Sequence, residues 1–378
     1  MIKVGAEREI KWQPELRADR QKNYDIKEYE SVHHRFATGE YDVYKNFNFS
    51  IFIDDYCNAD CKFCVAQLRY ANKGMMYKKD KIPERDWLVR CRQVLEQIRP
   101  LNPSISITGG EPTMSKKLIP VLEMVNELGF RKRTITTNGS HLFDKVGNKM
   151  VIDHLMDNGW NHLNISRPAI TDESAKRLMR FNNEEGFCSN EMMRDIIDIT
   201  NHSDMKHRIS CLLLKEEVNS VEKMKEFLDT YIDMGANNFI FRELMDYDTT
   251  AINIEKTQYC VDNKVKLNDI WAVIDNYPEF EKYLNILGYY YYVEIYKYRG
   301  ATVASEGANM VQQGIEVKKN PNRVYEAVFH PNGNLCASWI DKERVLDPYM
   351  HDIGGGTHAD MGPVEPGGPK DYILKVEK

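Results

Sequence analysis

The stretch CNADCKFC, residues 57–64, follows the mostly apolar run Phe47–Ile53. Its cysteines, Cys57, Cys61 and Cys64, have three and then two residues between them. If the chain's 8 cysteines were scattered at random over its 378 positions, this spacing would arise only about 0.004 times. Thiolates this close on one loop can bind a single soft metal centre. The stretch therefore predicts a metal-binding loop directly after a strand.

The number of cysteines indicates an incomplete ligand set. Zinc sites and ordinary iron–sulfur clusters take four protein ligands. The nearest other cysteine is Cys91, in a stretch with the apolar periodicity of a helix. Three cysteines therefore favour a cluster with one iron left open for a substrate or cofactor. A zinc loop with a distant fourth ligand is the alternative.

Composition limits the class of protein. The chain has 378 residues, 42% of them hydrophobic, enough for one large domain or one and a half. Its formal net charge of −6 argues against broad nucleic-acid binding. No apolar run approaches the ~20 residues of a membrane span, and the charged segment Met1–Glu30 lacks the apolar core of a signal peptide. Scattered cysteines suit a reducing compartment, so we expect a cytoplasmic protein. From the net charge and the absence of a long apolar run in the sequence, we expect neither nucleic-acid nor membrane partners.

Strand-like and helix-like segments alternate along the first two thirds of the chain, which predicts right-handed βα units around a parallel sheet. Six units are visible, where a closed barrel needs eight, so we expect an open partial (β/α)6 barrel. The expected strands are Phe47–Asp54, Ser104–Thr108, Arg133–Thr137, His162–Ser166, His207–Leu214 and Asn238–Glu243. The expected helices are Glu84–Arg99, Lys116–Leu128, Lys145–Asn158, Thr171–Phe181, Asn190–Thr200 and Ser220–Met234.

The motifs of the chain follow the expected strands. In parallel barrels the chemistry lies on the loops after the carboxyl ends of the strands. Turn residues alone explain Gly, Pro or Asn at any one such loop, but six loops on one rim indicate a site. These loops are the cysteine stretch, GGEP at 109–112, TNG at 137–139, SRP at 166–168, and the segments Leu214–Asn219 and Arg242–Met245.

The cysteine spacing, with the aromatic Phe63 before the last cysteine, resembles the signature of radical S-adenosylmethionine (SAM) enzymes. In that family three thiolates hold a 4Fe–4S cluster, and the open iron binds the amino and carboxylate groups of SAM. The resemblance implies that Cys57, Cys61 and Cys64 bind one such cluster. It also implies the open partial barrel, reductive cleavage of SAM to a 5′-deoxyadenosyl radical, and an electron donor such as flavodoxin or ferredoxin.

The same resemblance assigns the GGEP loop to SAM. The stretch TGGEP matches the family motif whose backbone and glutamate hold the SAM amino group. Paired glycines allow the backbone to approach a ligand closely. The role is therefore expected for Gly109, Gly110, Glu111 and Pro112.

Other SAM contacts are expected on neighbouring loops. Asn138 and Ser166 match family positions that hydrogen-bond the ribose or carboxylate of SAM. Arg167 departs from the pattern common in relatives; it either pairs with the SAM carboxylate or a substrate anion, or is a surface arginine. Phe63 and Leu213 are expected against adenine, with barrel core as the alternative.

Over Arg208–Asp246 the chain resembles the molybdenum-cofactor GTP cyclase group. Beyond Asp246 the resemblance to relatives is weaker, although Phe329–Cys336 resembles the hairpin that opens a SPASM/twitch module. Only Cys260 and Cys336 follow residue 211, too few for a second all-cysteine cluster. We expect a cluster-free C-terminal α+β module, with a helical Leu267–Leu287 that is interrupted near Pro278 and an aromatic strand at Tyr289–Tyr298. The expected division is an extension at 1–46, a barrel at 47–246, the module at 247–350 and a Gly/Pro-rich tail at 351–378.

These features predict an enzyme that abstracts a hydrogen atom from a small-molecule substrate. Cyclisation, epimerisation, dehydrogenation and carbon–carbon bond formation all remain open as outcomes. Modification of a ribosomal peptide is the alternative, and a non-enzymatic iron–sulfur sensor is a second one that would not need the GGEP and TNG loops. Cys336 and Cys211 are candidate hydrogen donors to a substrate radical, with inert packing as the alternative. Cys211 lies in the fifth expected strand, and we expect its side chain to face the barrel cavity. Cys336 is preferred because a thiol near the barrel mouth can be re-reduced.

Overall fold

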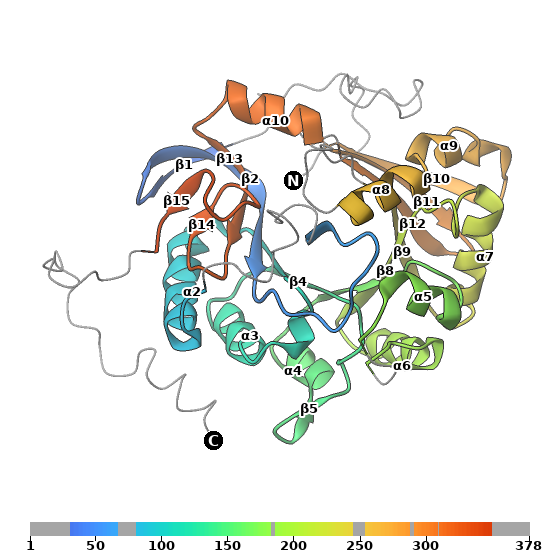
Figure 1. Ribbon diagram of the computed structural model, residues 1–378, viewed down its shortest axis with the longest axis horizontal. Helices are drawn as coiled ribbons and strands as arrows, with labels where there is room; N and C mark the ends of the chain where they lie inside the picture. Colours follow the sequence, from blue (N-terminus) through green and yellow to red (C-terminus); the bar gives the residue numbers. More distant parts are fainter. Residues whose placement is uncertain are drawn as a thin grey trace, which may run out of the picture.

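The computed structural model describes residues 31–66, 81–182, 186–244, 254–287, 291–308 and 310–349. Within these ranges one sheet contains 13 strands, and it curls so that helices lie on its outer side (Figure 1). The order along the sheet is β10-β11-β12-β9-β8-β7-β4-β3-β2-β13-β14-β15, with β1 paired to β2.

The six predicted barrel strands are present and lie side by side in parallel. Alternation decides which face of each strand is buried against helices: Ile105 and Ile107 are 0% exposed, while the intervening Ser106 faces the inner side. The open partial barrel is therefore confirmed. The strands are β2 (Gly39–Phe52), β3 (Ser104–Thr108), β4 (Lys132–Thr137), β7 (His162–Ser166), β8 (Lys206–Leu212) and β9 (Asn238–Arg242).

Helices follow these strands and cover the outer face of the sheet (Figure 1). Their apolar residues recur at helical spacing, as in α2, where Trp87, Cys91 and Val94 are buried. Ser189 and Ser220 begin α6 and α7, each accepting a hydrogen bond from a backbone N–H of the first turn. The helices are α2 (Glu84–Ile98), α3 (Leu118–Glu127), α4 (Val151–Asp157), α5 (Asp172–Met179), α6 (Asn190–Asn201) and α7 (Val221–Ile232). A two-stranded hairpin, β5 (Lys145–Val146) and β6 (Lys149–Met150), precedes α4, where a helix was expected from Lys145.

The C-terminal segment extends both edges of the parallel set. β12 (Ala301–Ala308) pairs in parallel with β9, and β13 (Arg323–Phe329) pairs in parallel with β2. Helix α10 (Met310–Lys319) connects these two strands across the open side of the sheet (Figure 1). The segment thus shares hydrogen bonds with the barrel, which sequence patterns did not indicate. The boundaries between domains stay predictions.

The remaining C-terminal elements correct one prediction and confirm another. A helix was expected through Leu287, but α9 (Leu267–Trp271) is short and β10 (Phe280–Leu287) is a strand. β10 pairs antiparallel with β11 (Tyr291–Tyr298), and this aromatic partner favours a strand over a helix: the rings of Phe280 and Tyr298 stack at 4.6 Å. The predicted hairpin is present as β13 and β14 (Leu335–Cys336), with β15 (Val345–Asp347) beside it.

The first strand was expected to begin at Phe47, after an N-terminal extension, but the described part of that extension already contains strands. β1 (Ser31–Phe36) and the start of β2 form an antiparallel hairpin, with Phe36 buried at its turn end. Residues 1–30 and the predicted tail at 351–378 lie outside the described residues.

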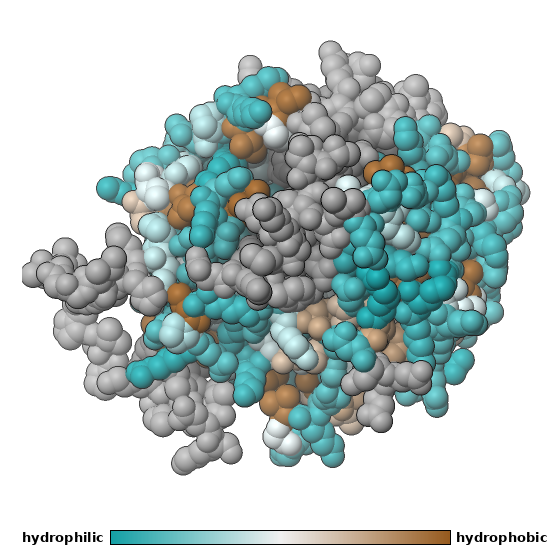
Figure 2. Space-filling model, viewed as in Figure 1, coloured by the Kyte–Doolittle hydropathy of each residue, from teal (hydrophilic) through white to brown (hydrophobic). Residues whose placement is uncertain are grey.

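In Figure 2 hydrophilic side chains dominate the surface around α5 and α7. None of the helices within the described ranges is long and apolar enough to cross a membrane.

Candidate cluster and cofactor site

The cysteine loop and the GGEP loop are joined backbone to backbone. The cysteine loop leaves β2 after Phe52, and the GGEP loop leaves the adjacent β3 after Thr108. Gly110 N donates to the carbonyl of Asp54 at 2.8 Å, and Glu111 N donates to that of Tyr56 at 2.7 Å. The two motifs therefore form one unit at the carboxyl ends of neighbouring strands.

This contact explains why two glycines are needed. A Cβ atom on Gly110 would lie 1.9 Å from the carbonyl oxygen of Tyr56, and one on Gly109 would lie 2.4 Å from that of Asp54. Gly109 also has a backbone φ of +154°, a value that residues other than glycine rarely adopt. The paired glycines were expected to admit a ligand; in the structure the backbone they admit is that of the cysteine loop.

Glu111 organises the loops after β3 and β4. Its side chain is only 2% exposed. Oε1 accepts from the backbone N–H of Thr113 at 3.0 Å and from the hydroxyls of Thr113 and Thr137, both at 2.5 Å. Oε2 accepts from the N–H of Asn138 at 2.7 Å. Among the described residues Oε2 accepts this one hydrogen bond, so it can accept another from a further donor. Pro112 begins the short 3-10 turn that places Thr113.

Two asparagines fasten the cysteine loop to the loop after β4. Asn58 is buried, and its Oδ1 accepts from Asn138 Nδ2 at 2.9 Å. Asn58 Nδ2 donates to Ser140 Oγ at 3.0 Å and to the carbonyl of Gly186 at 2.8 Å. Asn138 Oδ1 also accepts from the N–H and hydroxyl of Ser140. Asn138 was expected to bind SAM; these contacts leave it one amide hydrogen for a ligand. The roles of Asn58 and Ser140 were missed.

The three thiols have the chemistry of a cluster site. Cys57, Cys61 and Cys64 are not joined in a disulfide and are half-buried on one loop. Burial, and then the nearby Glu111 and Cys64, raise the pKa of Cys57 to about 12. Burial together with both other cysteines raises the pKa of Cys61. In the described ranges no three metal-binding side chains already converge on one ion. Three cysteine thiols on one loop are the ligand type that iron–sulfur clusters take.

Comparison with known proteins agrees with this geometry. Residues 51–228 match the radical SAM superfamily. This stretch of the chain is a radical SAM domain. It includes both the cysteine loop and the GGEP loop, and it extends into α7. The resemblance inferred from the cysteine spacing is thereby confirmed.

The curated relatives match this chain over part of their own length. The chain is 27% identical over 236 residues to molybdenum cofactor biosynthesis protein 1 of Dictyostelium discoideum, covering 62% of this chain and 33% of that protein. It is 33% identical over 121 residues to GTP 3′,8-cyclase of Staphylococcus saprophyticus, covering 32% of this chain and 33% of the cyclase. The chain thus spans about a third of each of these relatives. Streptococcus suis SuiB bound to precursor peptide SuiA is similar with a TM-score of 0.47 and 17% identity, covering 78% of this chain and 59% of SuiB.

Contacts from the C-terminal segment reach the cysteine loop of the radical SAM domain. Helix α8 (Ile254–Asn263) brings Lys256, 3% exposed, whose Nζ donates to Asp60 Oδ1 at 2.7 Å and to the Cys61 carbonyl at 2.5 Å. Trp339 packs with Cys64 against a small apolar cluster. Neither Lys256 nor Trp339 was predicted, because each lies far from the motif in the sequence.

Phe63 and Leu213, both expected against adenine, occupy different environments. Phe63 is partly buried against a small apolar cluster that includes Phe187, Leu214 and Cys260. Leu213 is 0% exposed within the main core between sheet and helices, which is the barrel-core alternative. Phe63 is therefore the better placed of the two to contact a ligand at the cysteine loop.

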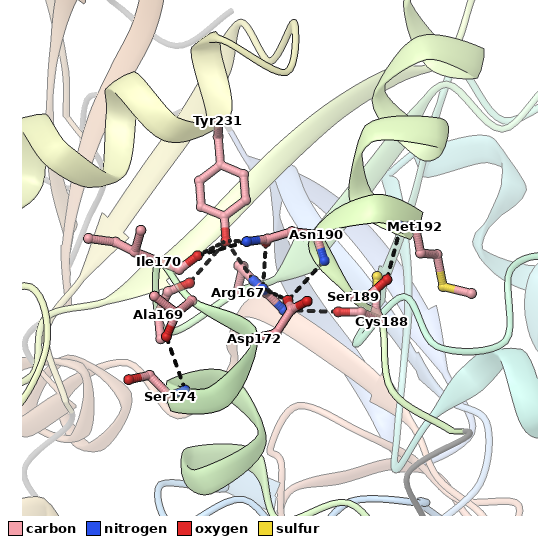
Figure 3. A network of polar contacts seen from close by, with 11 residues as sticks. Arg167, Ala169, Ile170, Asp172, Ser174, Cys188, Ser189, Asn190, Met192 and Tyr231 are labelled. Atoms are coloured by element: carbon pink, nitrogen blue, oxygen red, sulfur yellow. Dashed lines mark hydrogen bonds and ion pairs between the residues drawn. The ribbon is translucent and has the colours of Figure 1, made fainter.

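Arg167 ties the loop after β7 to three helices (Figure 3). Its side chain is 2% exposed, so it is not a surface arginine. Nε donates to the Tyr231 hydroxyl at 2.6 Å, Nη1 to the Cys188 carbonyl at 2.9 Å, and Nη2 to Asp172 and Asn190, both at 2.6 Å. Four of its five N–H groups are used within the protein. The expected pairing with a SAM carboxylate or substrate anion has little support from these contacts. Ser166, the preceding residue, is half-buried at the end of β7.

The two candidate hydrogen donors are both buried. Cys211 is 1% exposed and lies in the main core with Ile209, near Tyr231 of α7. The prediction that Cys211 faces the barrel interior is therefore wrong: alternation places Arg208, Ser210 and Leu212 on that side. Cys336 is 0% exposed, and its Sγ donates to the carbonyl of Asp341 at 3.5 Å. The structure shows the Cys336 side chain packed in the interior, and its role as a hydrogen donor stays a prediction.

Proposed function

We propose that the protein is a radical SAM enzyme with one 4Fe–4S cluster held by Cys57, Cys61 and Cys64. When bound, the cluster supplies the electron that cleaves SAM to methionine and a 5′-deoxyadenosyl radical, which abstracts a hydrogen atom from a small-molecule substrate. An external donor of the flavodoxin or ferredoxin kind reduces the enzyme. The observation that carries this proposal is the backbone pairing of the cysteine loop with the GGEP loop, which places soft thiols beside a buried carboxylate.

The chain's own residues hold SAM at this junction. The remaining acceptor position on Glu111 Oε2 receives an N–H of the SAM ammonium. Thr113, Thr137 and Asn138 fix the position of the carboxylate, because each of them donates hydrogen bonds to its oxygens. The remaining amide hydrogen of Asn138 and the hydroxyl of Ser166 lie on neighbouring loops and serve as ribose or carboxylate contacts.

Glu111→Gln is expected to weaken SAM binding about tenfold or more while the cluster still assembles. The substitution removes the charge that attracts the ammonium, and a charge-assisted hydrogen bond is worth roughly 1.5–3 kcal/mol. It also turns an acceptor into a donor facing other donors, so the free energy of unfolding should fall by roughly 1–3 kcal/mol. Titration calorimetry with SAM on the cluster-loaded protein, and urea denaturation without the cluster, measure the two effects.

The matched control is Glu226→Gln, because Glu226 lies on α7 with its side chain 53% exposed and pairs with Lys223. This control should bind SAM as the wild type does. Unchanged SAM affinity in Glu111→Gln would assign the ammonium contact to another residue.

A further inference from the structure

Helix α8 of the C-terminal segment holds a buried cation against the cysteine loop. The helix lies beside the segment that leaves β2 (Figure 1), and Lys256 in its first turn is 3% exposed. The ammonium of Lys256 forms an ion pair with Asp60 at 2.7 Å and donates to the backbone carbonyl of Cys61. Lys256 lies outside residues 51–228, which match the radical SAM superfamily. A residue from beyond the family match therefore brings a positive charge to the backbone of a cluster ligand.

The cysteine loop has other contacts that keep its path. Backbone N–H groups of the loop at positions 60 and 62 donate to the carbonyls of Arg180 and Leu178 at the end of α5, both at 3.1 Å. The Cys61 carbonyl already accepts from the backbone N–H of Cys64 at 3.2 Å. A neutral side chain in place of Lys256 would therefore leave this carbonyl satisfied, without the desolvation free energy that burying an ammonium costs. What Lys256 adds to the loop is its charge.

The other charged groups around Lys256 are nearer to solvent. The half-exposed carboxylate of Asp60 also pairs with Arg180 at 3.1 Å, and Arg180 pairs in turn with the exposed Glu255. Solvent and salt screen exposed charges much more than buried ones. On the buried side of the cysteine loop, the positive charge of Lys256 therefore acts more strongly than the charges of its partners.

We propose that Lys256 raises the reduction potential of the cluster held by the cysteine loop and so favours its reduction by the external donor. This inference rests on the proposed function, which supplies both the cluster and the donor. The potential of an iron–sulfur cluster depends on the net charge, hydrogen bonding and solvent exposure around it. One electron comes from the donor and adds one negative charge, which a fixed neighbouring cation stabilises. Lys256 would thus give the C-terminal segment a part in the first electron transfer.

The direction of the potential change separates a charge effect from a structural one. Lys256→Gln removes the positive charge but keeps a donor for the Cys61 carbonyl, so the midpoint potential should fall. Asp60→Asn removes a negative charge but keeps an acceptor for Lys256, so the midpoint potential should rise. A loosened loop would instead expose the cluster to water in both variants and move both potentials in the same direction.

Redox titration of the cluster-loaded full chain without SAM, followed by visible absorbance and by the EPR signal of the reduced cluster, tests this inference. In Lys256→Gln the equilibrium constant for reduction should fall at least about tenfold, which is about 59 mV for a one-electron couple. In Asp60→Asn it should rise by about threefold, because a half-exposed charge is partly screened. Lys256→Arg keeps the charge, so its equilibrium constant should stay within about threefold of the wild-type value.

The matched control is Arg299→Gln, which removes a cation at the far end of the strands. Arg299 pairs with Asp229 and Asp233. It precedes β12, which runs parallel to β9, so it lies at the amino ends of the strands and the cysteine loop lies at their carboxyl ends. Arg299→Gln should have the wild-type potential. A fall as large as that of Lys256→Gln would show a nonspecific charge effect and overturn the inference.

The remaining outcomes distinguish this inference from the proposed function. A wild-type potential in Lys256→Gln with four irons, or a fall in both Lys256→Gln and Asp60→Asn, would overturn the inference and leave the proposed function intact. If Lys256→Gln assembles fewer than four irons, Asp60→Asn decides, and a potential that does not rise there would overturn the inference. A wild type whose potential responds to Lys256 but that cleaves no SAM would overturn the proposed function and leave the inference.

Discussion

Replacing Cys57, Cys61 or Cys64 by alanine is expected to abolish the iron–sulfur cluster. Anaerobic reconstitution of the wild type should give about four irons per chain, and each variant should lose nearly all of the brown absorbance. The physical reason is the ligand count: with three protein thiolates there is no spare ligand, so removing one leaves two. The three cysteines also share one loop, so a missing thiol has no substitute close in sequence.

Cys91→Ala is the control for this result. Cys91 is 0% exposed in α2, packed in the core between helix and sheet. Its loss should lower the free energy of unfolding by roughly 1 kcal/mol through a small cavity while iron content stays at four. Eight irons in the wild type would contradict the single-cluster account. A full complement of iron in any of the three cysteine variants would assign that ligand elsewhere.

Gly110→Ala is expected to damage the site without removing any ligand. Its Cβ would meet the carbonyl oxygen of Tyr56 at 1.9 Å, and backbone on both sides must move to relieve this contact. Overpacking costs typically 1–3 kcal/mol, and here both hydrogen bonds between the two loops are strained as well. We therefore expect a free energy of unfolding lower by roughly 3 kcal/mol and SAM binding reduced at least about tenfold.

Gly314→Ala separates this effect from the general cost of changing glycine. Gly314 lies in α10, and a Cβ there would meet nothing within 4 Å. Alanine is the better helix former, so this variant should be as stable as the wild type or more stable by up to about 1 kcal/mol. Urea denaturation and SAM titration compare the two. Wild-type stability and SAM affinity in Gly110→Ala would show that the loops do not meet as the structure has them.

The six βα units could be predicted because their signals are local. Each strand and helix shows its own periodicity, and turn residues separate them, as at Gly129 after α3 and Gly235 after α7. The strands β12 and β13, which flank the six parallel barrel strands on either side, could not be placed in the sheet from the sequence. β13 pairs with β2 across more than two thirds of the chain, and no local pattern states which strand is a neighbour.

The residues of the site also divide into those that a local motif indicates and those that it does not. Cys57, Glu111 and Asn138 stand in short motifs, so the sequence alone indicated them. Asn58 and Lys256 act through tertiary contacts that only the folded chain shows. Cys211 was expected on the inner face of its strand, but it lies on the outer face, in the core. A shift of one residue along a strand is enough to move a side chain to the other face.

The formation of 5′-deoxyadenosine tests the central claim most directly. The reconstituted protein should be reduced anaerobically with dithionite, given SAM, and sampled over time for 5′-deoxyadenosine and methionine. We predict that both products form in equal amounts, and that the Cys61→Ala variant forms neither. A wild type with four irons and bound SAM that yields no 5′-deoxyadenosine, with or without cell extract as a source of substrate, would contradict the account and favour a non-catalytic iron–sulfur protein.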